Sequence, residues 1–347
     1  MNKEKEKTRR HCGTEDIDLY GLTSFFSLCL RASVFLFLTA ITQPIFSQCC
    51  SPGNPLGGAN SLGVNTEDSW QLFVNYRYGY SGKYFEGNRP SETQFIRNGN
   101  FNYLGLIAAF GLTDRLTLEA ETGFFINKTQ SYVEGIIPEK LIGNGLTDLN
   151  LLARFSFWKD PVREMEFNSG IGIKIPLGSY QKKYQGALLT RDLQPTTGSY
   201  DFVHTAFFYK GFLPQKLRLF IANRIEIKGN NPDQYRYGNF WTTSAFLSYS
   251  SGPRWIFVGQ IRTEFRGRDS RPLSGNGIPV DNERELVLPS GSQKLFLVPQ
   301  ISFAFSTSTY LSLLADIPVY QYYNDKQLAN TMAITLSFRK VFEKTGL

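Results

Sequence analysis

Residues 146–158 read LTDLNLLARFSFW, and this stretch decides the fold. Apolar residues occupy every second position: Leu149, Leu151, Ala153, Phe155 and Phe157. The alternate positions hold a mainly polar set: Asp148, Asn150, Leu152, Arg154, Ser156 and Trp158. A period of two residues predicts a β-strand with two different faces. In a soluble sandwich the apolar face packs inward, whereas in a membrane barrel it contacts lipid and the charged face points into the barrel.

The same alternation recurs along the chain in about twelve segments, most of them 10–13 residues long. Strands of soluble proteins usually have about 5–6 residues, whereas tilted strands that span a bilayer need about 9–11. Segment 100–112 is apolar on both faces, so its orientation stays open. The predicted strands are residues 70–80, 100–112, 116–126, 146–158, 164–177, 200–210, 217–228, 237–249, 254–266, 293–305, 310–320 and 328–342.

The connections between these segments alternate in length. Short connections are residues 111–115, 159–165, 211–216, 250–253 and 306–309, and a medium one at 321–327 joins the last pair. Long connections are residues 81–99, 127–145, 178–199, 229–236 and 267–292. Short turns at one end and long loops at the other are typical of outer-membrane barrels. The sequence therefore predicts an all-β fold, a transmembrane antiparallel up-and-down β-barrel of about 12 strands.

Charged side chains fall on one face of the clear strands, as expected because a charge facing lipid at the midplane costs about 2–4 kcal/mol. Two interpretations of the interior charges stay open: a salt-bridged filling of a closed barrel, or a narrow polar channel that selects solutes. Barrels of about eight strands are filled and those of about 16–18 strands are open, so strand number does not decide. The candidate pore-lining residues are Arg77, Glu119, Glu121, Asp148, Arg154, Lys174, Arg224, Glu226, Arg262 and Glu264.

Residues 1–47 have the order of a secretory signal peptide, which we expect to be cleaved after Ser47. A charged start is followed by an apolar core at 32–41 and by Pro44. A membrane anchor is the alternative, but it needs about 18 or more apolar residues. The predicted organisation is a signal peptide at 1–47, a flexible periplasmic leader at 48–69, the barrel at 70–342 and a tail at 343–347.

The formal net charge is +7, and a surplus of +6 stays after the signal is removed. This charge is spread along the chain without a basic run, so a nucleic-acid partner is not expected. The expected partners are membrane lipid and lipopolysaccharide, the outer-membrane assembly machinery and a small-molecule solute that the sequence does not name.

Cys49 and Cys50 form a vicinal pair in the predicted leader. Three interpretations stay open: acylation at Cys49, redox or metal chemistry, and an exposed pair without a role. Gln48 fits a lipobox poorly, and a bare pair of cysteines without further ligands is weak evidence for a metal site.

His204 is the only histidine after residue 47, and the alternation of its segment places it on the interior face with Phe202 and Phe208. Acyl-transfer enzymes need a serine and a histidine ordered by a third polar group, and no G-x-S-x-G motif occurs. We expect no catalytic residues, no metal site and no cofactor, so the protein is not predicted to be an enzyme.

Five motifs stand out along the chain: GLTDRLTLEA (111–120), GNGLTDLNLLARF (143–155), GIGIKIPLGSY (170–180), QPTTGSYDF (194–202) and PVYQYYNDKQL (318–328). In order and spacing they resemble the phenol meta-pathway-type family of outer-membrane β-barrels, whose members are described as transporters, some of them for hydrophobic compounds. The family's usual Pro-Thr-Gly turn is Pro176-Leu177-Gly178 here, a small departure. The resemblance covers most of residues 70–342 and is specific for fold and membrane but weak for substrate.

The expected function is therefore passive or facilitated passage of small molecules, including hydrophobic ones, through the cell outer membrane. A closed barrel with a surface-structural or adhesion role is the alternative. The sequence contains no motif that names a substrate.

Overall fold

The computed structural model describes residues 63–343 apart from residues 94, 136–138, 214–215 and 276–277. All of them belong to one compact unit, Ile45–Leu347. The predicted signal peptide, most of the predicted leader, and the pair Cys49–Cys50 lie outside the described residues.

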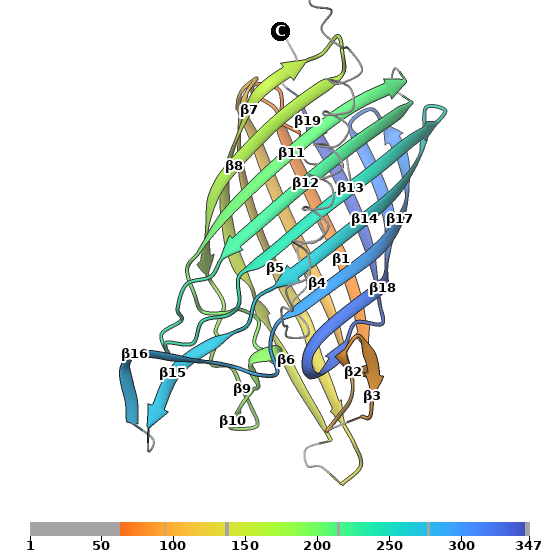
Figure 1. The fold of residues 1–347 in the computed structure, drawn as a ribbon. Coiled ribbons are helices and arrows are strands. Elements are labelled where there is room, and N and C mark those ends of the chain that lie inside the picture. The colour runs from red at the N-terminus through yellow and green to blue at the C-terminus, as the bar shows by residue number, and fades with distance from the viewer. Residues whose placement is uncertain (1–62, 94, 136–138, 214–215, 276–277, 344–347) are drawn as a thin grey trace, which may run out of the picture. The chain divides into compact units, whose positions relative to one another are not determined.

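Twelve antiparallel strands form a closed barrel (Figure 1). Consecutive barrel strands pair with each other, β19 pairs with β1, and each predicted segment matches one strand. The predicted fold class is thus confirmed. The barrel strands are β1 (Trp70–Ser81), β4 (Ile96–Thr113), β5 (Leu116–Tyr132), β7 (Asp148–Asp160), β8 (Met165–Pro176), β11 (Asp201–Leu213), β12 (Leu217–Ile227), β13 (Phe240–Ser251), β14 (Trp255–Arg266), β17 (Ser292–Ser306), β18 (Thr309–Ala329) and β19 (Met332–Phe342).

Short turns join the strands at one end, and long connections join most of them at the other, the lower end in Figure 1. At that lower end, residues 330–331 alone link β18 to β19. The prediction of a connection at 321–327 is wrong, because β18 continues to Ala329 and bends at Asp325, where φ is 58°. The long connections carry small elements: β2 (Lys83–Gly87), β3 (Arg89–Ser91), β6 (Lys140–Leu146), β9 (Lys183–Tyr184), β10 (Ala187–Leu188), the 3₁₀ helix η1 (Arg191–Leu193), β15 (Ser270–Gly275) and β16 (Ile278–Leu286).

The outer wall of the barrel is apolar. In β7, Leu151 is 39% exposed, while Arg154 and Ser156 are buried in the interior. A β-bulge after Ser156 shifts the register and turns Trp158 outward, so its predicted place on the polar face is wrong. No helix within the described residues is long and apolar enough to cross a bilayer.

The ambiguous segment 100–112 became β4, and its orientation is set by burial. Leu104 and Leu106 are exposed on the outer wall, whereas Ile107 and Ala109 are buried inside. The interior positions thus need not be polar, because apolar side chains there pack against one another.

The faces of β11 are the reverse of the prediction. Phe202 is 44% exposed on the outer wall, and Val203 and Phe207 are buried in the interior. His204 shares the outer face with Phe202, and its Nε2 lies 3.0 Å from Ser169 Oγ on β8. Both faces of this segment carry aromatic and apolar residues, so the alternation could not show which face points into the barrel.

Near the short turns, two apolar clusters lie inside the barrel among buried polar side chains such as Thr117, Asn168 and Ser302. One buried cluster lies a few positions from those turns and consists of Phe207, Phe220, Ala222, Phe246 and Val258. A second consists of Phe296, Val298 and Leu314. These clusters remove apolar surface from water in this half of the barrel.

The chain before β1 lies in the mouth formed by the short turns. The backbone N–H of Val64 donates to Glu166 Oε1 at 2.8 Å, and that of Asn65 donates to Thr117 Oγ1 at 2.8 Å. Val64, Glu166 and Thr117 are buried. Residues 63–69, the end of the predicted leader, are thus held by interior side chains.

Candidate functional site in the barrel interior

The structure places all ten predicted interior residues inside the barrel, each in an ion pair. Their inward orientation is part of the observed fold, whereas their role in lining a solute path stays a prediction. The pairs are Arg77–Asp316 at 2.5 Å, Arg154–Glu119, Lys174–Asp148 at 3.2 Å, Arg224–Glu121 at 3.0 Å, Arg224–Glu226 at 2.9 Å and Arg262–Glu264 at 3.0 Å.

The Arg224–Glu121 pair crosses the interior. Arg224 lies on β12 and Glu121 on β5, and three strands separate them around the wall. Both Glu121 carboxylate oxygens accept from Arg224 Nη1. A pair of this kind ties opposite parts of the wall together and fills the space between them.

The prediction missed Asp201, which joins two lysines. Its carboxylate lies 2.6 Å from Lys174 Nζ and 3.0 Å from Lys228 Nζ, and its side chain is fully buried. Because the prediction reversed the two faces of β11, Asp201 was not among the predicted interior residues. Reading Val203 and Phe207 as the interior face would have found it.

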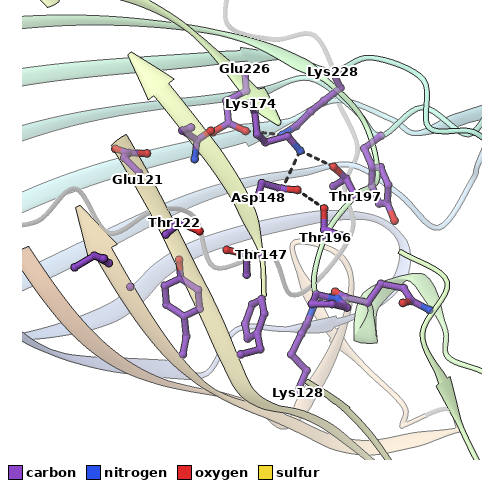
Figure 2. Close-up of a pocket in the computed structure, with 18 of the residues that line it drawn as sticks. Glu121, Thr122, Lys128, Thr147, Asp148, Lys174, Thr196, Thr197, Glu226 and Lys228 are labelled. Atoms are coloured by element: carbon purple, nitrogen blue, oxygen red, sulfur yellow. Dashed lines mark hydrogen bonds and ion pairs between the residues drawn. The ribbon is translucent and has the colours of Figure 1, made fainter. Parts of the chain in front are cut away.

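Residues 189–199, here called the inner segment, fold against the interior face of β5–β8. Lys128 Nζ donates to the carbonyl of Gln194 at 3.0 Å. Thr196 Oγ1 donates to Asp148, and Lys174 Nζ donates to Thr197 Oγ1 at 2.5 Å. Figure 2 shows Thr196 and Thr197 beside these side chains. Leu189, Leu193 and Ser199 are buried, so the inner segment packs against the wall.

A cavity of about 140 Å³ lies between the inner segment and the wall (Figure 2). Five of the ten predicted residues line it: Glu121, Asp148, Lys174, Arg224 and Glu226. The other five, Arg77, Glu119, Arg154, Arg262 and Glu264, lie elsewhere in the interior. Further charged lining residues come from strand ends and the inner segment: Lys128, Arg191, Asp192, Lys228 and Arg266.

Burial shifts the pKa of two loop carboxyl groups near the cavity. Desolvation raises the pKa of Asp192, and the nearby Lys128 opposes this shift. Burial likewise raises the pKa of Asp269, although the Tyr235 hydroxyl donates to its carboxylate at 2.5 Å. Both groups are therefore more easily protonated than an exposed aspartate.

The inner segment depends on the absence of a side chain at Gly143 in β6. A Cβ built there would lie 2.0 Å from the Leu193 carbonyl oxygen, which is too close for any real contact. We expect Gly143→Ala to push the inner segment away from the wall. Limited trypsin digestion should then cut after Arg191 about tenfold faster, because cleavage follows the population of the opened segment.

Gly259→Ala is the matched control, because a Cβ at this position in β14 meets no atom within 4 Å. It should leave the digestion rate unchanged. Equal rates for wild type and Gly143→Ala would show that the inner segment is not held by this contact.

Among the described residues, no group of three or more His, Cys, Asp or Glu side chains is arranged to hold a metal ion.

Comparison with known proteins supports the fold. No family model and no curated protein matches this chain. The COG4313 outer membrane channel from Pseudomonas putida F1 is similar in structure, with 14% identity, a TM-score of 0.59, and coverage of 85% of this chain and 100% of that one. A Pseudomonas aeruginosa FadL homologue gives 10% identity and a TM-score of 0.40, covering 86% of this chain and 99% of its own. The KdgM porin gives 5% identity and a TM-score of 0.41, covering 78% of this chain and 99% of its own.

Proposed function

We propose that this protein is an outer-membrane channel for passive or facilitated passage of small molecules. The observation that carries the proposal is the cavity under the inner segment, because a space with charged and apolar walls inside a barrel suits a solute. The similar barrel from Pseudomonas putida is also named a channel. Passage requires the inner segment to move, since it forms one wall of the cavity.

The apolar outer wall supports a place in the membrane. Leu151, Phe155 and Ile171 are exposed there, although water would make such a surface costly. Closed barrels with this exterior span bacterial outer membranes. We propose bilayer lipid and lipopolysaccharide as partners of this wall, and the outer-membrane assembly machinery as the partner during insertion.

We also propose membership in the phenol meta-pathway-type family. The motifs at 111–120, 143–155 and 170–180 support it, and Asp148 of the second motif and Lys174 of the third line the cavity. The substitution of Leu177 in the family's Pro-Thr-Gly turn is compatible with this assignment, because the following Gly178 is kept.

A closed barrel with a surface-structural or adhesion role is the second candidate. It is favoured by the filled interior, in which ion pairs and apolar clusters bury most inward side chains. Such a filling stabilises a barrel without offering a path.

Flux measurements separate the two candidates. We expect liposomes containing the purified protein to swell in small solutes, and planar bilayers to show discrete conductance steps. Both signals should increase in Gly143→Ala and stay at the wild-type level in Gly259→Ala. Absence of steps and of swelling in all three proteins would exclude the channel and leave the structural role.

A further inference from the structure

We propose that the cavity is a binding site for a small organic anion, a carboxylate carried by a compact apolar body about the size of one aromatic ring. This inference rests on the proposed function, since it names the class of molecule that the interior site would take. It follows from the hydrogen-bonding groups that the protein leaves unused, from the charge of the lining, and from the size of the cavity.

The strand carboxylates of the cavity already have donors on both oxygens. Arg224 and Lys228 contact the two oxygens of Glu226 at 2.9 and 2.5 Å. Thr196 and Lys174 contact the two oxygens of Asp148. With Glu121 bound by Arg224, these acids have little capacity left to receive a donor from a ligand.

Donors, in contrast, are left over. Arg224 uses Nε and Nη1 for Glu226 and Glu121, but its Nη2 has no hydrogen-bond partner, although the residue is only 2% exposed. A buried guanidinium N–H without an acceptor is costly. Nη2 is covered in this structure, so a carboxylate in the cavity supplies that acceptor once the guanidinium turns toward it, and it then gains a charge-assisted hydrogen bond.

Two more guanidinium groups line the cavity. Arg191 lies over the ring of Tyr235 at 4.0 Å, and Arg266 lies 5.8 Å from the centroid of Phe240. In the part of the chain that the structure describes, neither has a side-chain hydrogen bond or an ion pair. Stacking fixes the plane of a guanidinium group while its N–H donors stay available.

The lining side chains carry six cations and four carboxylates. One of those four, Asp192, comes from the inner segment and has no hydrogen bond within the described residues. Asp201, behind the lining, pairs with Lys174 and Lys228, so a surplus of one positive charge is left. The lining therefore attracts an anion, and Asp192 weakens this attraction when ionised.

The uncharged lining combines polar side chains, such as Asn75, Thr122 and Gln194, with an apolar and aromatic part that includes Tyr103, Ile107, Phe125, Pro195 and Tyr237. An apolar wall next to unused cationic donors fits an amphipathic anion better than inorganic phosphate. The volume of about 140 Å³ limits the size of this anion. A cavity of about 150 Å³ in another protein takes up benzene, which sets the scale at a single ring.

Calorimetric titration of the purified full chain in detergent tests the inference, with benzoate as the probe. Benzamide has the same shape without the charge, and benzylammonium carries the opposite charge. We expect benzoate to bind at least about tenfold more tightly than either, since charge-assisted hydrogen bonds are stronger than neutral ones. Equal binding of benzoate and benzamide would overturn the inference.

Three variants locate the site. Arg191→Gln and Arg266→Gln should each weaken benzoate binding by about tenfold, while Asp192→Asn should strengthen it, because it removes a negative charge. A gain of affinity cannot result from misfolding, so Asp192→Asn keeps the test valid if the other two variants fold poorly. Benzoate affinity unchanged in all three variants would contradict the inference.

Arg271→Gln is the matched control. Arg271 is exposed on the β15–β16 hairpin, pairs with Glu285 and does not line the cavity. It should bind benzoate like the wild type, and an equal loss in this variant would overturn the inference. Flux distinguishes the two proposals: swelling without selective benzoate binding refutes the anion site alone, whereas selective binding without swelling refutes the channel alone.

Discussion

Leu151→Arg is expected to prevent most of the protein from inserting as a folded barrel. Leu151 is the fourth residue of β7 and belongs to the apolar outer face, with Ala120 of β5 and Ile173 of β8 as its register partners. An arginine at the bilayer midplane costs about 2–4 kcal/mol, which is a large part of the stability of an ordinary domain. Heat-modifiable gel mobility of the membrane fraction measures the folded share.

Leu188→Arg is the control for this change. Leu188 is also exposed but belongs to the short strand β10 in a long connection, outside the barrel wall. The same exchange there should leave insertion within about 0.5 kcal/mol of wild type, as for surface substitutions in general. If both variants insert equally well, the outer wall does not face lipid.

Asp316→Ala is expected to lower the free energy of unfolding by about 3–5 kcal/mol, because removing one partner of a buried ion pair is strongly destabilising. Arg262 keeps its pair with Glu264 in this variant. Asp316 on β18 accepts from Arg77 at 2.5 Å and from Arg262 at 3.0 Å, and all three side chains are buried. Without the carboxylate, two guanidinium groups would face each other in the interior. Urea unfolding in lipid vesicles, followed by tryptophan fluorescence, measures the change.

Glu285→Ala provides the comparison, since its pair with Arg271 is largely exposed. Exposed pairs contribute about 0–1 kcal/mol, so this variant should unfold close to the wild-type urea concentration. A small effect of Asp316→Ala as well would mean that water reaches the Arg77–Asp316 pair and that the interior is wetter than its packing indicates.

The strands could be predicted because the residues of each strand alternate between lipid and the barrel interior, and this alternation is visible within a short stretch of sequence. In β7, the alternation from Leu149 to Ser156 and the charge of Arg154 within it were enough to distinguish the face toward lipid from the face toward the interior. In β11, aromatic and apolar residues occupy both parities, so nothing local distinguished Phe202 from Val203. A single bulge after Ser156 was likewise invisible, because register depends on the partner strand.

The candidate site was predictable only in part. Glu121, Asp148, Lys174, Arg224 and Glu226 line the cavity because strand alternation points them inward, and that much follows from periodicity. Arg191 and Asp192 lie in a connection without any period, and Arg266 lies at the end of a strand. Their place at the cavity depends on the folding of residues 189–199 back into the barrel.

The sequence by itself determined a membrane barrel of twelve strands, its charged interior and the two ends with short and long connections. These properties follow from alternation, segment length and the cost of a charge in lipid, all of which act within one strand. Only the tertiary structure decided which charges pair, where the inner segment lies and that a cavity is left beneath it. Contacts such as Arg224–Glu121 and Gly143–Leu193 join residues far apart in the chain, and no local pattern specifies them.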